Sequence, residues 1–446
     1  MSAVAERSPL CHDAAGEEHS PLLLDITRLV WRTPRSGPSG IDRIELEYAL
    51  HFLAAGARRP AYGVINVFGW LLAISPRGGR RFLSNLAGRW ANAGHGEGHV
   101  PSVLSIYWQL TTSLWTVGPF LRAKLRRHKG IPTYLVVSHH HLSRQQTVPR
   151  IRRAFGVRCV CFLHDIIPVE FPEYFRAGWE ERGKKLADNV ARHFDAVLVN
   201  SEATAQSFRR HMATDLQLDP RAAPAIHVAA PGVRAINLVQ PAIADAVPTP
   251  TSFAPPRTGV TARPYFVVLG TIEPRKNHLL LLNVWTRLSN FQQQPPLLHV
   301  IGARGWENEQ VVDHLERARR LRGLVLEHNR LNDTAVARML CGARALLLPS
   351  FVEGFGLPLA EALAAGVPVI CSDIPAFREV GGVVPEYLDP LDHFAWKAAV
   401  LDYSRPDSQR RSAQLERLKG WQAPSWETHF AIVEQALQIP APAGAC

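Results

Sequence analysis

The chain has 446 residues, of which 46% are hydrophobic and 20% are charged. At roughly 150 residues per domain, this length predicts two large domains or three smaller ones, and the composition excludes wholesale disorder. Lysine and arginine number 50 against 39 acidic residues, which gives a net charge of +11. Such a surplus favours an anionic partner: nucleic acid, an anionic phospholipid surface or a phosphorylated small molecule.

The cysteines and the N-terminal residues predict a cytoplasmic protein. The six cysteines are scattered without CxxC spacing, which is typical of a reducing compartment. Residues 1–20 hold no apolar run and are predicted to be a disordered leader rather than a secretory signal. Val103–Leu121 comes nearest to a membrane span, but Gln109 and Gly118-Pro119 interrupt it, and a spanning helix needs ~20 predominantly apolar residues. We therefore expect a soluble or membrane-peripheral protein.

The first elements of the chain predict an α/β domain. Pro21–Trp31 is a strand candidate, Arg32–Gly40 is rich in turn formers, and a helical pattern runs from Ile41 to Gly56. A strand, a glycine-bearing loop and a helix in this order open an α/β domain. Further buried-strand candidates follow at Thr133–Ser138, Val157–Leu163 and Asp195–Asn200.

A second α/β domain is predicted after a linker over residues 239–264, which are crowded with proline, alanine and threonine. Apolar strand candidates then alternate with helical patterns, at Tyr265–Gly270, His278–Leu288, Leu297–Gly302, Asn308–Leu321, Leu324–Glu327, Asp333–Cys341, Ala345–Pro349 and Val367–Cys371. Apolar strands separated by helices indicate a parallel sheet covered on both faces. The predicted fold is α/β, with two doubly wound Rossmann-like domains, 21–238 and 265–430, facing each other across a cleft. A last helix can cross back to the first domain, and residues 431–446 are predicted to be a tail.

The segment Leu347–Gly366 carries the chemistry of the predicted second domain. A strand candidate ends at Pro349, glycines occupy the next loop, and Pro358 stands where a helix would start. Glycine N–H groups at a helix N-terminus form a site for phosphate. Glu353 in the loop and Glu361 in the helix would repel phosphate but can accept hydrogen bonds from sugar hydroxyls. A ligand with both kinds of group, such as a nucleotide sugar, fits this turn.

A pair of cations is predicted beside this turn. Leu269–His278 follows the first strand of the second domain and contains Arg275 and Lys276. Because ligands bind outside the carboxyl ends of strands in open parallel sheets, these cations would lie at the ligand, where they suit a diphosphate. The alternatives are a solvated basic turn for the cations and solvated surface charges for Glu353 and Glu361.

The sequence GTIEPRKN, followed further along by PSFVEGFGLPLAEALAAGVPVICSD, resembles glycosyltransferase family 4, whose members are retaining enzymes of the GT-B fold. Glu353 and Glu361 match the family's E-x7-E signature, with EGFGLP and AxGxPVI around it. The resemblance covers the layout of Leu22–Phe430 and is strongest over Phe266–Gly382. It implies a transferase that binds a nucleotide sugar in the second domain.

The resemblance implies roles for individual residues on the donor side. Glu353 would bind hydroxyls of the donor sugar, and Glu361 would bind the ribose. Arg275 and Lys276 would neutralise the leaving nucleoside diphosphate. Thr271 stands where many members carry arginine, which leaves these two as the only obvious cations in their loop. Three consecutive backbone N–H groups would lie against the sugar and diphosphate, those of Phe355, Gly356 and Leu357.

The resemblance extends to the first domain. Gly37 and Gly40 match the glycine-bearing loop that approaches the donor phosphate from across the cleft. His164 in FLHDIIP matches the family histidine near the donor sugar, and Asp165 could orient its ring. A histidine after an apolar strand can instead cap that strand by hydrogen bonding. The predicted catalytic residues are His164, Glu353, Arg275 and Lys276.

Metal-independent catalysis is predicted, with no resident cofactor. Glycosyl transfer builds negative charge on the departing phosphate, and fixed cations and N–H dipoles stabilise such charge. The sequence has no Asp-X-Asp motif, through which GT-A enzymes hold a metal over the diphosphate. The resemblance implies front-face attack, in which a donor phosphate oxygen takes the acceptor proton. No metal site is expected at His139–His141, because neighbouring side chains on a strand end point to alternate sides.

A basic segment after the apolar run predicts contact with an anionic membrane surface. Pro119–Gly130 brings together five cations, Arg122, Lys124, Arg126, Arg127 and Lys129. Apolar and aromatic residues beside a basic cluster are typical of an interfacial membrane anchor. A solvated basic helix is the alternative. In a transferase the anchor would bring the cleft to a lipid-diphosphate acceptor.

Two other classes of function lack their sequence features. No finger, RRM or helix-turn-helix signature accompanies the basic charge, so no nucleic-acid partner is expected. Neither SGPSG nor LGTIEP supplies the GxGxxG of a dinucleotide-dependent oxidoreductase.

The sequence therefore predicts a retaining glycosyltransferase, peripheral on the inner face of the cytoplasmic membrane. It would move a hexose, with mannose from GDP-mannose as the first choice, to a lipid-linked saccharide in the synthesis of exopolysaccharide, capsule or LPS. The choice of mannose rests on similarity in HDIIP and EPRKN. The alternatives are a UDP-sugar-dependent glucosyl or rhamnosyl transferase of the same family, and a catalytically silent relative that acts as a binding partner.

Overall fold

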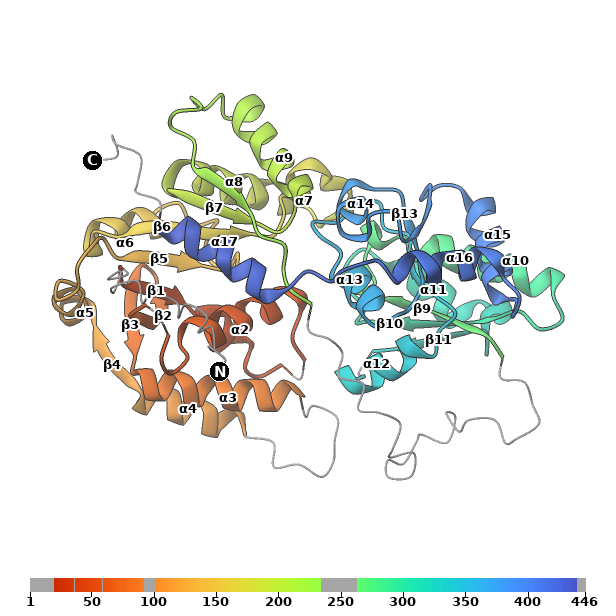
Figure 1. Ribbon diagram of the computed structural model, residues 1–446, viewed down its shortest axis with the longest axis horizontal. Helices are drawn as coiled ribbons and strands as arrows, with labels where there is room; N and C mark the ends of the chain where they lie inside the picture. Colours follow the sequence, from red (N-terminus) through yellow and green to blue (C-terminus); the bar gives the residue numbers. More distant parts are fainter. Residues whose placement is uncertain are drawn as a thin grey trace, which may run out of the picture.

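The computed structural model describes residues 20–35, 37–57, 59–91, 102–233, 263–329 and 331–438. These residues form two lobes, each built on one β-sheet flanked by helices (Figure 1). This architecture confirms the predicted α/β class. Except for residue 20, the predicted leader lies outside the described residues, and so does the predicted linker except for residues 263–264.

The first lobe is built on an eight-stranded sheet in the order β4-β3-β2-β1-β5-β6-β7-β8. Its strands are β1 (Leu22–Asp25), β2 (Ala61–Val67), β3 (Trp70–Ile74), β4 (Leu114–Val117), β5 (Thr133–Val136), β6 (Arg158–Leu163), β7 (Ala196–Val199) and β8 (Ala225–Val228). The main helices are α1 (Thr27–Arg32), α2 (Gly40–Phe52), α3 (Pro76–Ala91), α4 (Val103–Thr112), α5 (Gly118–Leu125), α6 (Thr147–Phe155), α7 (Ile167–Glu170), α8 (Trp179–His193) and α9 (Glu202–Arg210). Leu22 and Leu24 of β1 pack into one hydrophobic cluster and Leu23 into another, so both faces of the sheet are covered.

The predicted strand Pro21–Trp31 is wrong in its second half. The strand β1 ends at Asp25, and α1 takes the residues after it. The buried Asp25 carboxylate accepts a hydrogen bond from the N–H of Thr27 at 2.9 Å, which turns the chain out of the sheet. The apolar run continues through this turn because Leu29 is buried on the inner face of α1.

The first sheet is parallel only from β2 to β8, because β3 pairs antiparallel with both β2 and β4. Phe68 and Gly69 connect β2 to β3 with φ angles of 53° and 93°. Two-residue hairpin turns need positive φ at these positions. The turn is held by Asn66, whose side-chain oxygen accepts from Gly69 N at 2.9 Å. An aromatic residue at the first turn position hid this hairpin in the sequence.

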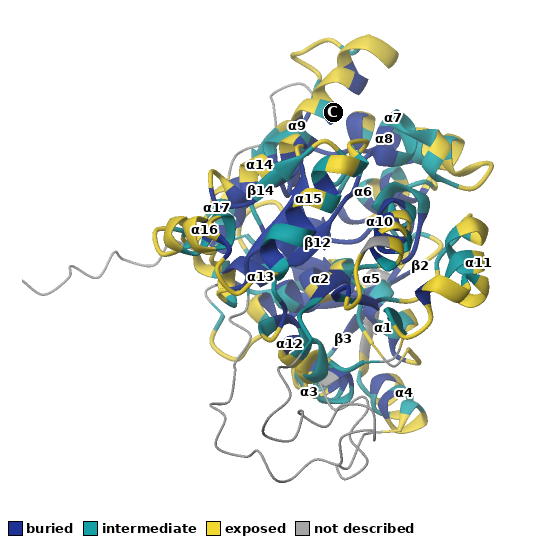
Figure 2. Ribbon diagram, turned by 90° about the vertical axis from the view of Figure 1, so that its right-hand side faces the viewer, coloured by how far each residue is buried: buried dark blue, intermediate teal, exposed yellow. Residues whose placement is uncertain are grey.

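The second lobe is built on a six-stranded parallel sheet in the order β11-β10-β9-β12-β13-β14. Its strands are β9 (Tyr265–Leu269), β10 (Leu297–Ile301), β11 (Val325–His328), β12 (Leu346–Leu348), β13 (Val369–Ser372) and β14 (Glu386–Leu388). Its helices are α10 (His278–Phe291), α11 (Glu309–Arg317), α12 (Asp333–Cys341), α13 (Leu357–Ala364), α14 (Pro375–Gly381), α15 (His393–Ser404) and α16 (Gln409–Leu418). The buried strands lie between helices whose outer faces are exposed (Figure 2).

The last helix, α17 (Trp426–Gln438), returns to the first lobe (Figure 1). Phe430 and Val433 are buried in the core of that lobe, and the ring Nε2 of His429 lies 2.8 Å from the hydroxyl of Tyr48. The predicted tail over 431–446 is therefore wrong up to Gln438, because burial of this apolar face keeps the chain helical. This helix therefore brings the end of the described chain back to the first lobe.

The apolar run Val103–Leu121 is divided among α4, β4 and α5. Among the described residues, no helix is both long and apolar enough to cross a bilayer. Gln109 stays at the surface of α4, where its side-chain oxygen accepts a hydrogen bond from Asn85 at 2.5 Å.

Candidate active site

Loops from both lobes meet at the carboxyl ends of the strands. In the second lobe, residues 270–277 follow β9 and residues 349–356 follow β12, and the N–H of Phe351 donates to the carbonyl of Arg275 at 2.8 Å. In the first lobe, His164 follows β6. A Cβ on Gly354 would lie 2.6 Å from the carbonyl oxygen of His164, so only glycine permits this approach of the two lobes.

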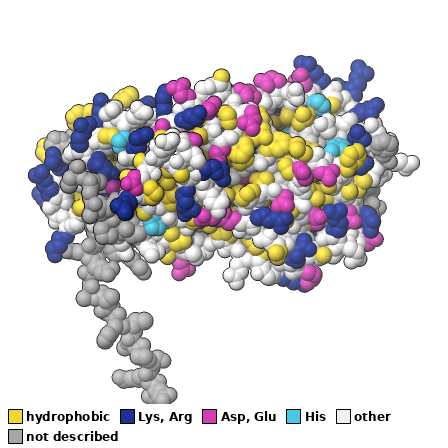
Figure 3. All heavy atoms as spheres, turned by 90° about the horizontal axis from the view of Figure 1, so that it is seen from above, with side chains coloured by type: hydrophobic (Ala, Val, Ile, Leu, Met, Phe, Trp, Pro, Cys, Tyr) yellow, Lys and Arg dark blue, Asp and Glu magenta, His cyan; other side chains and the backbone are white. Residues whose placement is uncertain are grey.

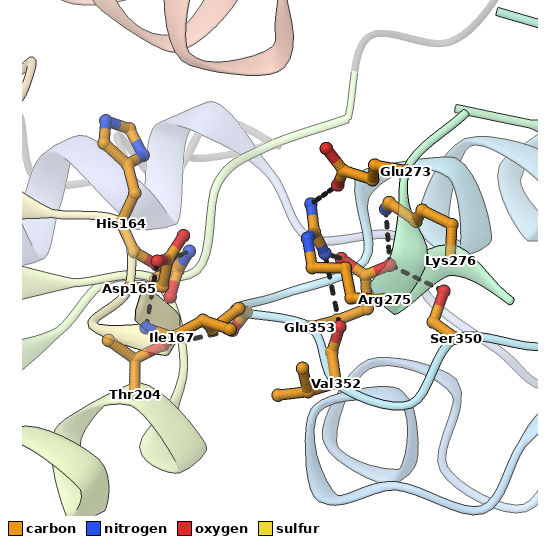
Figure 4. A network of polar contacts seen from close by, with 12 residues as sticks. His164, Asp165, Ile167, Thr204, Glu273, Arg275, Lys276, Ser350, Val352 and Glu353 are labelled. Atoms are coloured by element: carbon orange, nitrogen blue, oxygen red, sulfur yellow. Dashed lines mark hydrogen bonds and ion pairs between the residues drawn. The ribbon is translucent and has the colours of Figure 1, made fainter. Parts of the chain in front are cut away.

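A compact ion cluster occupies this junction (Figure 4). Arg275 Nη1 donates to Glu353 Oε2 at 2.6 Å, and the Lys276 ammonium donates to the other carboxylate oxygen. That same oxygen accepts from the hydroxyl of Ser350 at 2.8 Å. On its far side, Arg275 Nη2 pairs with Glu273 at 2.7 Å. Glu353 therefore fixes both predicted cations in one place.

The cluster is buried, and burial and pairing shift the pKa of each member. Burial alone would raise the pKa of Glu353, but Arg275 and Lys276 overcome that effect and lower it to about 2. The pKa of Arg275 is raised by Glu353 and Glu273 against the effect of burial. Burial and the neighbouring guanidinium lower the pKa of Lys276, and burial raises the pKa of Glu273. Both cations are thus held oriented in a partly desolvated site.

The cluster retains hydrogen-bonding capacity for an anion. An ammonium has three N–H donors and a guanidinium has five. Among the described residues, Lys276 donates only to Glu353, while Arg275 uses its two terminal nitrogens on Glu353, Glu273 and the carbonyl of Val352. Donors on both side chains therefore remain for a ligand, and oriented cations cost little reorganisation when negative charge develops.

Acidification is expected to remove the stabilisation that Glu353 supplies. Its pKa of about 2 lies below the ordinary 4.5, so its contribution is complete above pH 4.5 and is lost as the pH falls from 4.5 through about 2. The difference corresponds to about 3 kcal/mol of unfolding free energy. Urea unfolding between pH 5 and 3 should show a shallower loss of stability in Glu353→Gln than in the unchanged chain.

Glu361→Gln is the matched comparison for this measurement. Burial raises the pKa of Glu361, so ionisation of that carboxyl opposes folding and its effect on stability grows as the pH rises. The Gln variant should therefore gain stability relative to the unchanged chain at neutral pH. Parallel pH profiles for the Glu353 and Glu361 variants would contradict the assigned shifts.

The N-terminus of α13 lies next to the ion cluster. Gly356 has a φ of 100°, and a Cβ there would lie 2.7 Å from the ring of Phe377. Pro358 is in the first turn, as predicted. Within the described chain, the N–H groups of Phe355, Gly356 and Leu357 donate to no protein acceptor. They are therefore available to an anion, in addition to the side-chain cations.

Glu361 lies in α13, near Arg43 of α2 and Asp333 of α12. Arg43 and Asp333 form an ion pair of 2.6 Å between the two lobes. Glu361 thus faces the cleft at a different point from Glu353, which is bound into the ion cluster. The two glutamates have no side-chain partner in common among the described residues. Glu361 is the more available of the two to a hydroxyl group.

The glycine-bearing loop after β1 reaches the second lobe. A Cβ on Gly40, the first residue of α2, would lie 3.3 Å from the side chain of Leu357, whereas one on Gly37 would meet nothing within 4 Å. Ser39 caps α2: its hydroxyl oxygen accepts from the N–H of Asp42, while the Asp42 carboxylate accepts from the N–H of Ser39. The loop is therefore rigid at Gly40 and faces the start of α13.

His164 is held by the first lobe. Its ring Nε2 donates to the carbonyl of Val137 at 2.8 Å, and burial lowers its pKa to about 3, so the ring is neutral. Figure 4 shows the ring pointing away from Arg275 and Glu353. The expectation that Asp165 orients this ring is wrong, since the Asp165 carboxylate accepts from the N–H of Ile167 instead. What His164 brings to the cleft is its carbonyl, next to Gly354.

The run His139–His141 forms polar contacts inside the first lobe. His139 Nε2 accepts from the N–H of His164 at 3.0 Å, and His141 Nε2 lies 2.8 Å from the carboxylate of Asp25. Throughout the described part of the chain, no group of three or more His, Cys, Asp or Glu side chains could hold a metal ion.

Several residues that the sequence analysis missed hold the lobes together. The hydroxyls of Ser201 and Thr204 donate to the carbonyl of Gly354 at 2.6 and 3.2 Å. The Glu379 carboxylate of the second lobe accepts from the N–H of Glu202 at the start of α9. A serine before a helical pattern predicts a cap, but sequence alone does not show that the cap also binds the opposite lobe.

An aromatic seam adds to this contact. Tyr174 of the first lobe stacks on Phe351 of the second, with ring centroids 5.4 Å apart. Trp306 Nε1 donates to the carbonyl of Tyr174 at 3.0 Å, and its ring lies 5.5 Å from that of Trp179. Phe351 belongs to the loop that carries Glu353, so the seam also supports the ion cluster.

Two sheets whose parallel strands face each other through their carboxyl ends define the GT-B architecture. Solved structures of two GT-B enzymes align with nearly the whole chain. They are sucrose-phosphate synthase from Thermosynechococcus elongatus (TM-score 0.58, 15% identity, 94% of this chain and 98% of that one) and α,α-trehalose 6-phosphate synthase from Burkholderia multivorans (TM-score 0.59, 12% identity, 94% and 98%). At this identity the likeness confirms the GT-B fold and goes no further.

Residues 255–382 match the family model of glycosyl transferases group 1. The chain therefore contains a glycosyl transferases group 1 domain, which includes Arg275, Lys276, Glu353 and Glu361. Its match runs from the predicted linker to the end of α14, the region where the sequence resemblance is strongest.

Curated bacterial proteins with similar sequences include O-antigen mannosyltransferases. O-antigen chain mannosyltransferase B of Escherichia coli is 36% identical over 163 residues, which are 36% of this chain and 42% of that protein. The serotype-specific mannosyltransferase WbdA of Escherichia coli is 28% identical over 300 residues, which are 65% of this chain and 35% of that protein. The chain thus spans less than half the length of these relatives.

Proposed function

We propose that this protein is a retaining glycosyltransferase of family 4 that moves mannose from GDP-mannose to a lipid-linked saccharide in the synthesis of a surface polysaccharide. The observation that carries the proposal is the ion cluster of Arg275, Lys276 and Glu353 beside the free N–H groups at the start of α13. The group 1 domain and the O-antigen mannosyltransferases among the similar proteins support it.

The cluster would supply positive charge to the departing diphosphate. Arg275 and Lys276 are already oriented by Glu353 before the donor arrives, so their donors can follow the charge that develops on the leaving oxygen. The N–H groups of residues 355–357 would bind the same phosphates. Glu361 would accept a ribose hydroxyl, and the acceptor proton would pass to a donor phosphate oxygen. We therefore propose transfer without a metal ion.

The first test is binding of nucleotide sugars by the purified full chain. A ligand that binds only the folded state raises the melting temperature by mass action. GDP-mannose is expected to raise it more than UDP-glucose or ADP-glucose, and Lys276→Met is expected to abolish the shift. The hydrolysis of GDP-mannose to GDP and mannose in the presence of EDTA should equal that without EDTA, and loss with EDTA that manganese restores would contradict the metal-free proposal.

The outcome separates the alternatives for the donor. A larger shift with UDP-glucose would replace the mannosyl proposal with a UDP-sugar-dependent transferase. No shift with any nucleotide sugar would overturn the enzymatic proposal and favour the silent partner subunit.

We also propose that the first lobe lies on the cytoplasmic face of an anionic membrane. Leu104 and Trp108 of α4 and Phe120 of α5 are 81%, 72% and 73% exposed. Exposed arginines follow at Arg122 and at 126–127. Lys and Arg side chains lie at the end of the molecule where Figure 1 places α5, and others are spread over the rest of the face that Figure 3 shows. Apolar side chains beside basic ones favour an interfacial site and a lipid-linked acceptor.

Cosedimentation with vesicles containing phosphatidylglycerol tests this surface. Replacing Arg122, Arg126 and Arg127 with glutamine is expected to reduce the bound fraction several-fold, because each cation near an anionic surface contributes about 1 kcal/mol. The matched control replaces three exposed arginines of the second lobe, Arg317, Arg319 and Arg322, and so removes the same charge. Equal binding by both triple variants would overturn the proposal.

A further inference from the structure

A cavity in the first lobe lies away from the cleft. It has a volume of about 150 Å³ and lies between the C-terminal end of α2, the N-terminal end of α3 and the strands β2 and β3. The residues that line it include Ala61, the first residue of β2, and Ile74, the last residue of the antiparallel β3. These positions belong to the amino-terminal edge of the parallel strands of the first sheet, opposite the carboxyl edge, which faces the second lobe and its ion cluster. The cavity is therefore a separate site.

A buried arginine lines this cavity. The side chain of Arg59 is only 2% exposed, and its Nη2 pairs with Glu434 of α17 at 2.7 Å. Among the described residues, its Nε and Nη1 have no hydrogen-bond partner. Because a buried guanidinium with unpaired N–H groups costs free energy, this position is explained if a further acceptor binds there.

The described lining of the cavity carries arginines, although Glu434 behind it pairs with Arg59. Arg80 lines it as well, and none of its described lining residues is acidic. The N-terminus of the 16-residue helix α3 also faces it through Pro76 and Gly79. Ser75 already caps this helix, since its hydroxyl oxygen accepts from Gly78 N at 3.2 Å. The ligand contacts would therefore come from the side chains, with the helix dipole adding to the field.

The cavity has room for more than a single water. A water takes about 30 Å³ in the liquid, well below the volume of this cavity. Gly79 is buried in α3, yet a Cβ there would meet nothing within 4 Å. At Gly79 the wall of the cavity is therefore formed by backbone atoms, and no side chain fills the space in front of them.

From these observations we propose that the cavity binds a small phosphate-bearing molecule through Arg59 and Arg80, at a site distinct from that of the nucleotide sugar. A phosphate dianion supplies the acceptors that the guanidinium of Arg59 lacks. Glu434 offsets the charge of Arg59, so the unbalanced positive charge at the cavity comes from Arg80. Because Arg59 also holds Glu434, the ligand would share its arginine with α17, the helix that returns from the second lobe.

The test is thermal unfolding of the full chain in sodium phosphate or mannose 6-phosphate, each against sodium chloride of equal ionic strength. Four proteins are compared: the unchanged chain, Gly79→Leu, Arg80→Gln and Arg81→Gln. Leucine at 79 fills the cavity and favours the helix, so loss of folding does not confound the result. Arg81 is the matched control, since it is exposed, adjacent in α3 and not part of the cavity wall.

Phosphate is expected to raise the melting temperature of the unchanged chain and Arg81→Gln by several degrees, and that of Gly79→Leu and Arg80→Gln by much less. The donor site is the same in all four, so phosphate bound there would shift all of them equally, and this result would overturn the proposal. No shift in any protein would overturn it as well. A larger shift with mannose 6-phosphate than with inorganic phosphate would support a sugar phosphate as the ligand, and equal shifts would support the phosphate group alone.

Discussion

Replacing Glu353 with glutamine is expected to lower transferase kcat/KM at least 100-fold. The glutamine keeps the size of the side chain but removes the charge that orients Arg275 and Lys276. Loss of one oriented donor at a developing oxyanion costs about 10²- to 10³-fold in rate, and here two cations lose their anchor together. The measurement is release of GDP from GDP-mannose in the presence of an acceptor fraction from the membrane.

The same substitution should also destabilise the chain. Removing one partner of a buried ion pair costs about 3–5 kcal/mol, because it leaves an uncompensated buried charge. Activity must therefore be measured well below the melting temperature, with circular dichroism as the check on folding. A fully folded variant without activity would assign the loss to the site itself.

Ser350→Ala is the graded control for this prediction. It removes one hydrogen bond from an uncharged hydroxyl to the same carboxylate oxygen, at a cost of about 1.5 kcal/mol. The activity should fall by roughly tenfold or less, since 1.4 kcal/mol corresponds to a factor of ten. If Glu353→Gln lost no more activity than Ser350→Ala, the ion cluster would not be the source of the rate enhancement.

The arrangement of the candidate site in the second lobe could be predicted from the sequence where it depends on residues close together in the chain. Glycines, proline and glutamates within one strand-loop-helix unit determine where α13 starts and which groups surround its N-terminus. The alternation of strands and helices predicts a parallel sheet but does not give the order of its strands. In the structure β9 and β12 are neighbours, which places the loop of Arg275 beside that of Glu353. What could not be predicted is that Glu353 binds both cations, since this depends on side-chain orientation across two loops.

The first lobe was harder to predict because its contacts are made over long distances. His164 follows a buried strand, as expected, yet its ring partner is the carbonyl of Val137, directly after the neighbouring strand β5. The β2–β3 hairpin has Phe68 at a position with positive φ, which carries no turn signature in the sequence. In both cases the local structure depends on a residue that is close in space, and the sequence around His164 or Phe68 does not show which residue that is.

The contact between the lobes is likewise a property of the tertiary structure. Ser201 would be read from sequence as an ordinary helix cap, but its hydroxyl also donates to Gly354 in the loop of Glu353. The loop of Glu353 is therefore held from the first lobe by hydrogen bonds and by the stacking of Tyr174 on Phe351. We therefore expect the proposed donor binding to be coupled to the contact between the lobes through this loop.

Asp42→Ala is expected to destabilise the chain by about 3 kcal/mol or more and to raise KM for the donor. The Asp42 carboxylate is fully buried and pairs with Arg28 at 2.7 Å and Arg32 at 2.8 Å. It also accepts hydrogen bonds from the N–H and hydroxyl of Ser39, the cap of α2. The substitution leaves two guanidinium groups without their counter-charge and removes half of the capping box. Urea unfolding measures the first effect.

The rise in KM follows from the position of the cap. Ser39 and Gly40 hold the glycine-bearing loop against Leu357, next to the N–H groups at the start of α13. Without Asp42 the loop loses this anchor, so the donor phosphates would bind to a less ordered loop and KM should rise. We expect kcat to change less than KM, because the proposed source of the rate enhancement is the ion cluster of the second lobe. Asp333→Asn is the control, because it breaks an exposed interlobe pair with Arg43 and should cost no more than about 1 kcal/mol. Equal destabilisation by the two variants would mean that the buried carboxylate does not organise the loop.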